Sequence, residues 1–217
     1  MGSAVATPTN EDSSAVPATR VVAAGIPTAR ETREVVIAWQ PSHQADTGGA
    51  GWKEYHICGD IADRAIDELT EFEHVKAWDT KHGLTGTNNY RPHPTNTKAF
   101  DREVKLANRA NADVFIAIHN DGGAPSGILG ECMGSDRKSK ALCKALVKGL
   151  SARLEMDNRG VREVRIYSLE KVRNHAEYRC LLEVGDNAAD RAFLESPDGR
   201  QKVAEAIAEV IRDFEFD

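Results

Sequence analysis

Short, almost entirely apolar runs recur along this chain and constrain its fold more than any other feature. Three of them are Val35–Trp39, Val114–Ile118 and Cys180–Val184, the last of which contains Glu183. Runs of this length without polar alternation are typical of strands buried inside a sheet. Stretches with the period of an amphipathic helix, such as residues 54–69, lie between them. Strands that alternate with helices predict an α/β sheet covered by helices on both faces.

The pattern predicts the position of each element. The interval at residues 80–96 is rich in Gly, Asn and Pro and is expected to be a long loop, and residues 157–160 are expected to form a turn. We expect strands at 35–39, 74–79, 113–119, 127–133, 164–169 and 178–185, and helices at 54–69, 97–111, 135–154, 188–194 and 198–214.

Length and composition set limits on domain number and partners. The chain has 217 residues, of which 41% are hydrophobic and 29% are charged, which suits one domain with a single core. Residues 1–33 are poor in large apolar side chains and are expected to be a flexible tail or linker, which leaves 34–217 as the folded domain. The net charge of −6 argues against a nucleic-acid partner.

Export and redox environment are less constrained. No stretch of about 18 apolar residues could span a membrane, and no apolar segment typical of a signal peptide follows Met1. The four cysteines, Cys58, Cys132, Cys143 and Cys180, lack the CxxC spacing of a zinc knuckle. Buried free thiols are the expectation for all four, with one or two disulfides left open for an exported protein. The sequence therefore leaves the pairing and the compartment undecided.

Polar residues stand where three of the predicted strands end. Glu183 lies near the end of its strand, His119 ends another, and His43 follows a third after a Gln-Pro-Ser turn. In open α/β sheets, ligands and catalytic groups gather outside the carboxyl ends of the strands. A carboxylate in an apolar run is costly unless it has a role, although a buried structural ion pair is the alternative for Glu183. Two histidines and a glutamate at such ends predict a metal-assisted active site.

A catalytic zinc takes three protein ligands and leaves one position for water. His43 and His119 supply two, and Glu54 is the best third candidate because it precedes Ile57 and Cys58 by three and four residues on the apolar face of its helix. Each residue taken alone has a simpler explanation. A first-turn glutamate compensates the helix dipole, and a lone histidine at a strand end is more often structural.

Several ordered segments resemble the zinc-dependent N-acetylmuramoyl-L-alanine amidases of type 3, which act in bacterial cell-wall remodelling, sporulation and phage lysis. The resemblance covers about residues 35–213. Departures from the family's pattern are Ser42, Gln44 and Ala45 around the first histidine, where glycines are usual, Tyr178 in place of a proline, and Asp186 in place of an aromatic residue. The segments that carry the resemblance are His43, residues 54–62, 102–108 and 112–120, the turn at 158–161, and Leu182–Gly185.

The resemblance implies a twisted, mostly parallel six-stranded sheet flanked by helices, with one zinc ion held by His43, Glu54 and His119. It also implies that Glu183 is the catalytic carboxylate, which takes a proton from the attacking water and delivers it to the leaving L-alanine nitrogen. The expected reaction is cleavage of the amide between the N-acetylmuramoyl lactyl group and L-alanine of peptidoglycan. Two alternatives stay open: a zinc carboxypeptidase acting on stem peptides, and a catalytically silent wall-binding or regulatory module.

Further residues are candidates for contacts with substrate. Asn120, Arg159 and His175 are candidate substrate-binding residues, and Arg159 or Arg173 would suit the terminal carboxylate that a carboxypeptidase must bind. We expect a peptidoglycan or muropeptide substrate and a monomer, although the sequence does not set the oligomeric state. The expected location is the cell wall or extracellular space, with any leader already removed, or the cytoplasm of a phage-infected cell for a lysin.

Overall fold

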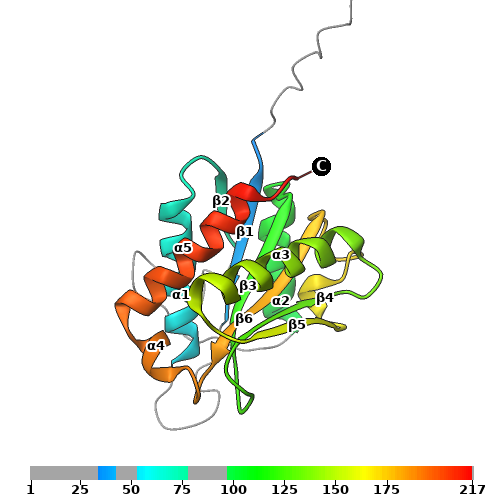
Figure 1. Ribbon diagram of the computed structural model, residues 1–217. Helices are drawn as coiled ribbons and strands as arrows, with labels where there is room; N and C mark the ends of the chain where they lie inside the picture. The colour runs from blue at the N-terminus through cyan, green and yellow to red at the C-terminus, as the bar shows by residue number, and fades with distance from the viewer. Residues whose placement is uncertain (1–33, 43–52, 78–96, 217) are drawn as a thin grey trace, which may run out of the picture. The chain divides into compact units, whose positions relative to one another are not determined.

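Six strands form one sheet in the computed structural model, which describes residues 34–42, 53–77 and 97–216 (Figure 1). The strand order is β2-β1-β3-β6-β4-β5. β2, β1, β3 and β6 are parallel to one another, whereas β4 is antiparallel to β6 and β5 is parallel to β4. The predicted mostly parallel six-stranded sheet is therefore confirmed. The strands are β1 (Val36–Pro41), β2 (Glu73–Lys76), β3 (Val114–Asp121), β4 (Ile128–Cys132), β5 (Asn158–Glu163) and β6 (Tyr178–Asp186).

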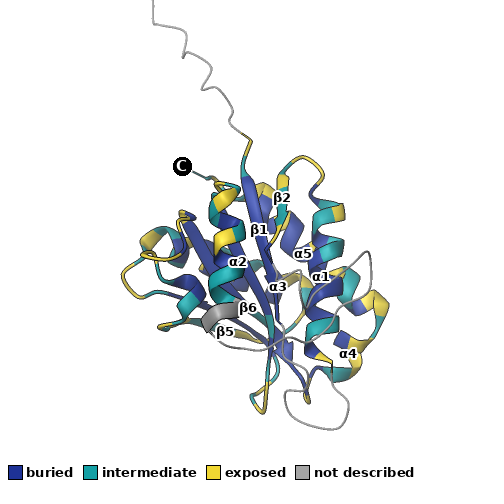
Figure 2. Cartoon of the chain, turned by 180° about the vertical axis from the view of Figure 1, so that it is seen from behind, coloured by how far each residue is buried: buried dark blue, intermediate teal, exposed yellow. Residues whose placement is uncertain are grey.

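Helices cover both faces of this sheet, as the alternating pattern predicted. The core on one face is shared with α1, α3 and α5, and the core on the other face is shared with α2 and η1, a short 3₁₀ helix (Figures 1 and 2). The helices are α1 (Glu54–Glu68), α2 (Thr97–Arg109), α3 (Arg137–Leu154), η1 (Tyr167–Leu169), α4 (Arg191–Glu195) and α5 (Pro197–Asp213).

The two-sided cover explains the apolar runs. Successive side chains of a strand point to opposite faces, so Ile116 of β3 enters the core beneath α1, α3 and α5, whereas Phe115 enters the core beneath α2. Leu182 and Leu181 of β6 divide between the cores in the same way. Figure 2 shows the central strands in the dark blue of buried residues. A strand that must be apolar on both faces has no polar alternation to display.

Two of the four cysteines form a disulfide, which corrects the expectation of free thiols. Cys143 of α3 is bonded to Cys180 of β6, with their Cα atoms 5.6 Å apart. Cys58 and Cys132 are free and buried, as expected. The pairing joins residues 37 positions apart in the sequence, so it depends on how α3 packs against the sheet and is not encoded in local spacing.

The region around β5 also differs from the prediction. Residues 157–160 were expected to be a turn and 164–169 a strand, but β5 covers Asn158–Glu163 and the later segment forms η1. The backbone does turn locally at residues 158–160, because Asn158 Oδ1 accepts a hydrogen bond from the Gly160 N–H at 2.9 Å and Gly160 has φ of 81°. This turn produces an irregularity inside β5, where the register against β4 shifts. Leu169 packs into the core beneath α2 instead of pairing in the sheet.

Some expectations concern residues that the structure does not describe. The tail at 1–33, the loop at 80–96 and His43 lie outside the described residues. Within residues 34–42, 53–77 and 97–216, no helix is both long enough and apolar enough to cross a membrane.

Candidate active site

His119 and Glu183 lie opposite each other on adjacent strands. They are register partners of β3 and β6, which are parallel, so both side chains come to the carboxyl edge of the sheet. β1 ends at the same edge: Pro41 is level with Ile118, and the Ser42 N–H donates to the Ile118 carbonyl at 2.7 Å. His43 comes next in the chain but lies outside the described residues.

Glu54 is the first residue of α1, and its side chain contacts His119. Its side chain is fully buried, as its position on the apolar face of the helix predicted. Glu54 Oε1 lies 3.2 Å from His119 Nδ1 and also accepts a hydrogen bond from the Asn120 N–H at 3.4 Å. The structure thus brings together Glu54, His119 and Glu183, three of the four residues proposed for metal binding and catalysis.

Burial and charge shift the pKa values of His119 and Glu183. Burial alone would lower the pKa of His119, but the hydrogen bond with Glu54 and the nearby charge of Glu183 outweigh it and raise that pKa. Burial raises the pKa of Glu183 to about 7; the charge of His119 opposes this, and Asp121 is among the carboxylates that add to it. A carboxyl group that titrates near neutrality is suited to accept and return a proton.

Glu183 is also left with an unused oxygen. Its Oε2 atom is buried and has no hydrogen-bond partner in the part of the chain that the structure describes. A carboxylate buried for structural reasons is normally paired, because leaving it unpaired costs free energy. The observation does not fit the structural ion pair considered for Glu183.

Asn120 and Cys58 are hydrogen-bonded to each other next to Glu54. The Cys58 thiol donates to Asn120 Oδ1 at 3.0 Å, and both residues are buried. Burial, followed by the charges of Glu54 and Glu183, raises the pKa of Cys58 well above its usual value, so the sulfur stays protonated and acts as a donor. Because a metal binds the thiolate and not the thiol, Cys58 is suited to packing and to positioning Asn120.

The three other candidate binding residues separate in space. Arg159 lies near the site, at the start of β5, where its Nη2 is 2.7 Å from Asp121 Oδ2. His175 lies at the amino end of β6, the opposite end from Glu183, and its N–H donates to Asn108 Oδ1 at 2.9 Å. Arg173 lies beside it on the same distant segment, paired with Glu170 at 2.8 Å.

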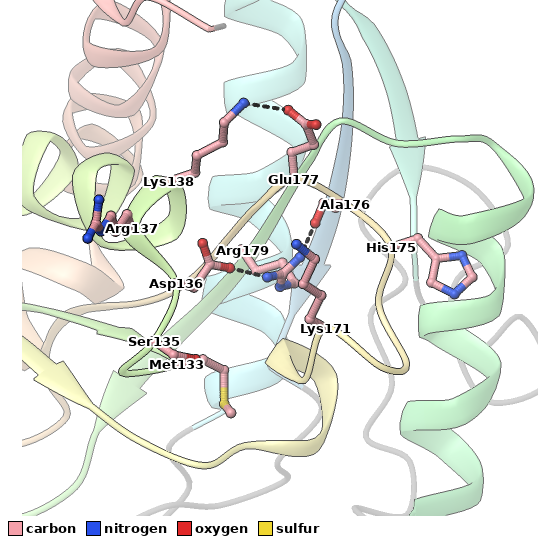
Figure 3. A pocket seen from close by; sticks show the side chains of 10 residues that line it. All are labelled: Met133, Ser135, Asp136, Arg137, Lys138, Lys171, His175, Ala176, Glu177 and Arg179. Carbon is pink, nitrogen blue, oxygen red and sulfur yellow. Dashed lines mark hydrogen bonds and ion pairs between the residues drawn. The ribbon is translucent and has the colours of Figure 1, made fainter.

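His175 lines a different pocket, of about 510 Å³, formed at the far end of the sheet by Met133, Asp136 and Arg179 among others. Figure 3 shows the ion pair between Asp136 and Arg179 in this pocket, with His175 to one side. The structure therefore brings Asn120 and Arg159 to the carboxyl edge and leaves His175 and Arg173 away from it.

Glu131 is a site neighbour that the sequence analysis missed. It is buried on β4, where Leu129, two residues earlier, is level with Glu183, and its carboxylate pairs with Arg162. The charge of Glu131 is one of those that raise the pKa of Glu183. A carboxylate within the apolar run 128–132 is the same signal that singled out Glu183, and it could have been used here.

The donor atoms at the carboxyl edge suit a zinc ion. Two ligand atoms bound to one tetrahedral zinc at about 2.0–2.1 Å stand roughly 3.3 Å apart, and Glu54 Oε1 and His119 Nδ1 are separated by 3.2 Å. Within the described ranges, no group of three or more potential ligands is assembled. A zinc ion at this place would need a third ligand from outside the described ranges, and His43 is the residue predicted for it.

Comparison with known proteins finds relatives of this chain in sequence and in fold. A relative from Bacillus anthracis, described as an uncharacterized cell wall amidase, is 29% identical over 141 residues, which are 57% of this chain. The match spans only 25% of that relative's length. The chain thus spans about a quarter of the curated relative that it matches.

Solved structures share the fold. The N-acetylmuramoyl-L-alanine amidase from Clostridium difficile 630 superposes with a TM-score of 0.67 at 17% identity, covering 83% of this chain and 96% of that one. The amidase AmiC2 of Nostoc punctiforme gives 0.65 at 22% identity, covering 82% and 96%. The catalytic domain of the CD27L endolysin gives 0.60 at 14% identity, covering 85% and 99%. The family model described as N-acetylmuramoyl-L-alanine amidase matches residues 37–213, so the chain belongs to that family.

Proposed function

We propose that this protein is a zinc-dependent hydrolase that cleaves the amide bond between the N-acetylmuramoyl lactyl group and L-alanine of peptidoglycan. The observation that carries the proposal is the half-buried Glu183 carboxyl, which has a pKa raised to about 7, a buried oxygen without a hydrogen-bond partner among the described residues, and a place opposite His119. Membership of the amidase family supports the choice of bond.

His43, Glu54 and His119 are the residues proposed to hold the zinc ion. Zinc, when bound, supplies Lewis acidity that polarises the scissile carbonyl and lowers the pKa of water. Glu54 Oε1 faces His119 Nδ1, as two ligands of one ion would, and it also accepts a hydrogen bond from the Asn120 N–H. A partner such as the Asn120 N–H fixes the orientation of a ligand and is commonly worth 10- to 100-fold in metal affinity.

Glu183 is proposed to move the proton. In its ionised form it accepts a proton from the attacking water, and in its protonated form it gives that proton to the nitrogen of the departing L-alanine. Both forms are accessible near neutral pH because burial raises the pKa of this carboxyl to about 7. The step breaks the amide C–N bond and forms a C–O bond, leaving a carboxylate on the lactyl group and an amine on the stem peptide.

Mass analysis of digested peptidoglycan tests the proposal. Release of intact stem peptides with a free L-alanine amine is the expected result, and the Glu183→Gln variant is the matched control because it keeps the shape of the side chain. Shortened stems would instead identify the carboxypeptidase. Absence of any product from protein with a full complement of zinc would favour the silent wall-binding module.

The proposed location is the cell wall or the extracellular space. The Cys143–Cys180 disulfide supports an oxidising compartment, because structural disulfides persist there and are rare in the reducing cytosol. The relative from Bacillus anthracis, described as a cell wall amidase, supports the same location. Peptidoglycan or its muropeptide fragments are the proposed partners.

A further inference from the structure

Three buried polar atoms near the carboxyl edge of the sheet lack hydrogen-bond partners within the described part of the chain: Glu183 Oε2, Asn120 Nδ2 and Arg159 Nη1. Buried donors and acceptors are nearly always satisfied, and each exception has a free-energy cost. Glu183 has the role proposed above. The unused donor of Arg159 has no role in the mechanism proposed above.

Arg159 is held in place but only partly used. Its side chain is 16% exposed, and Asp121 Oδ2 lies 2.7 Å from Nη2, which leaves the Nη1 edge of the guanidinium without a partner. Arg179, which is fully buried, is arranged differently, because its donors reach the Leu169 carbonyl at 3.0 Å, the Ala176 carbonyl and Asp136. An unused donor is therefore not a general result of burying arginine in this fold.

The position of Arg159 relative to Glu183 follows from the strand register. Leu129 of β4 is level with Glu183 on one side, and Ile128 is level with Asn158 of β5 on the other. Two strand spacings thus separate the backbones of β6 and β5, a distance of about 10 Å. An extended peptide advances about 3.3–3.6 Å per residue, so a stem whose first amide lies at Glu183 brings its second or third residue to Arg159.

We propose that Arg159 binds a carboxylate on the second or third residue of the stem peptide and so selects stems in which that carboxylate is free. This inference rests on the proposed amidase function and names a specificity residue for it. A guanidinium presents parallel N–H donors that match the two oxygens of a carboxylate, and Asp121 keeps it oriented before substrate arrives.

Two muropeptides that differ only in having free or amidated stem carboxylates provide the test. We expect the wild-type protein to show a KM about tenfold lower for the free form, with kcat nearly equal. Arg159→Gln should abolish this preference by raising the KM of the free form alone. Arg165→Gln is the matched control, because Arg165 is an 87% exposed arginine just beyond β5 and its loss should leave the preference intact.

A binding measurement separates this inference from the proposed function. In zinc-loaded Glu183→Gln protein, which should not cleave, calorimetry with the free and amidated stem peptides should show the same tenfold difference, and additional Arg159→Lys should reduce it while keeping the charge beside Asp121. Equal cleavage and equal binding of both forms would overturn the role of Arg159 and leave the amidase standing. Binding with the expected difference but no cleavage by the wild type would overturn the amidase alone.

Discussion

His119 and Glu183 are register partners on parallel strands β3 and β6, and both have raised pKa values: burial raises that of Glu183, whereas the hydrogen bond with Glu54 and the charge of Glu183 raise that of His119 against the opposing effect of burial. The proposed metal ligand and the proposed proton carrier therefore lie side by side at one edge of the sheet, and both are held by strands and not by loops. Sites built on paired strands hold their geometry more rigidly than sites built on loops.

Replacing the proposed proton carrier tests the mechanism directly. Glu183→Gln should remain folded and keep its zinc but lose on the order of 10²- to 10⁴-fold in kcat, because the amide cannot accept a proton. Zinc content, melting temperature and turnover should be measured on one sample. Turnover close to that of the wild type would rule out the proposed role.

The raised pKa of Glu183 predicts how stability depends on pH in the metal-free protein. The folded-state pKa is about 7 and the ordinary value is 4.5, so between these limits the folded protein binds a proton that the unfolded chain releases. Stability therefore falls as pH rises through this window, and Glu183→Gln should escape the loss. At pH 8 the variant should be more stable by on the order of 2–3 kcal/mol, with little difference near pH 4.

Denaturant titrations across this pH range measure the effect. Glu215→Gln is the control, since it removes an exposed carboxylate far along the chain and should track the wild type. A Glu183→Gln variant that was less stable than the wild type at pH 8 would instead indicate a structural ion pair.

Removal of His119 should abolish tight zinc binding. His119→Ala takes away one of the two donor atoms that lie 3.2 Å apart, and the two remaining proposed ligands, His43 and Glu54, are fewer than the three that a catalytic zinc needs. Elemental analysis after dialysis should find about one zinc per wild-type chain and almost none in the variant. His175→Ala, which removes an exposed histidine at the other end of β6, should keep its zinc.

Reduction of the disulfide should destabilise the protein. Cys143 and Cys180 are 37 residues apart, and cross-linking a loop of that length restricts the unfolded chain by about 3–4 kcal/mol in the chain-entropy model. The free energy of unfolding should therefore fall by up to that amount in a strong reductant. A double variant with alanine at both positions should show no response to the reductant, whereas a wild-type protein equally stable with and without reductant would contradict the prediction.

The sequence by itself determined the alternation of strands and helices, because a strand covered on both faces has to be apolar throughout and an amphipathic helix has to show its stripe. The same logic indicated Glu183 and His119, since a polar side chain at the end of a buried run stands out against its neighbours. Glu54 was identified because its position on the apolar face of α1 follows from helical periodicity alone.

Only the tertiary structure decided the features that depend on which elements become neighbours. Because β4 pairs antiparallel with β6, Glu131 comes close to Glu183, and Arg159 of β5 reaches the carboxyl edge of the parallel strands. His175 is only eight positions before Glu183 in the chain, but it lies just before the amino end of β6, far from that edge. The Cys143–Cys180 bond likewise depends on how α3 packs on β6. Local propensity has no information about such contacts, because they depend on strand order and helix packing, which only the completed fold specifies.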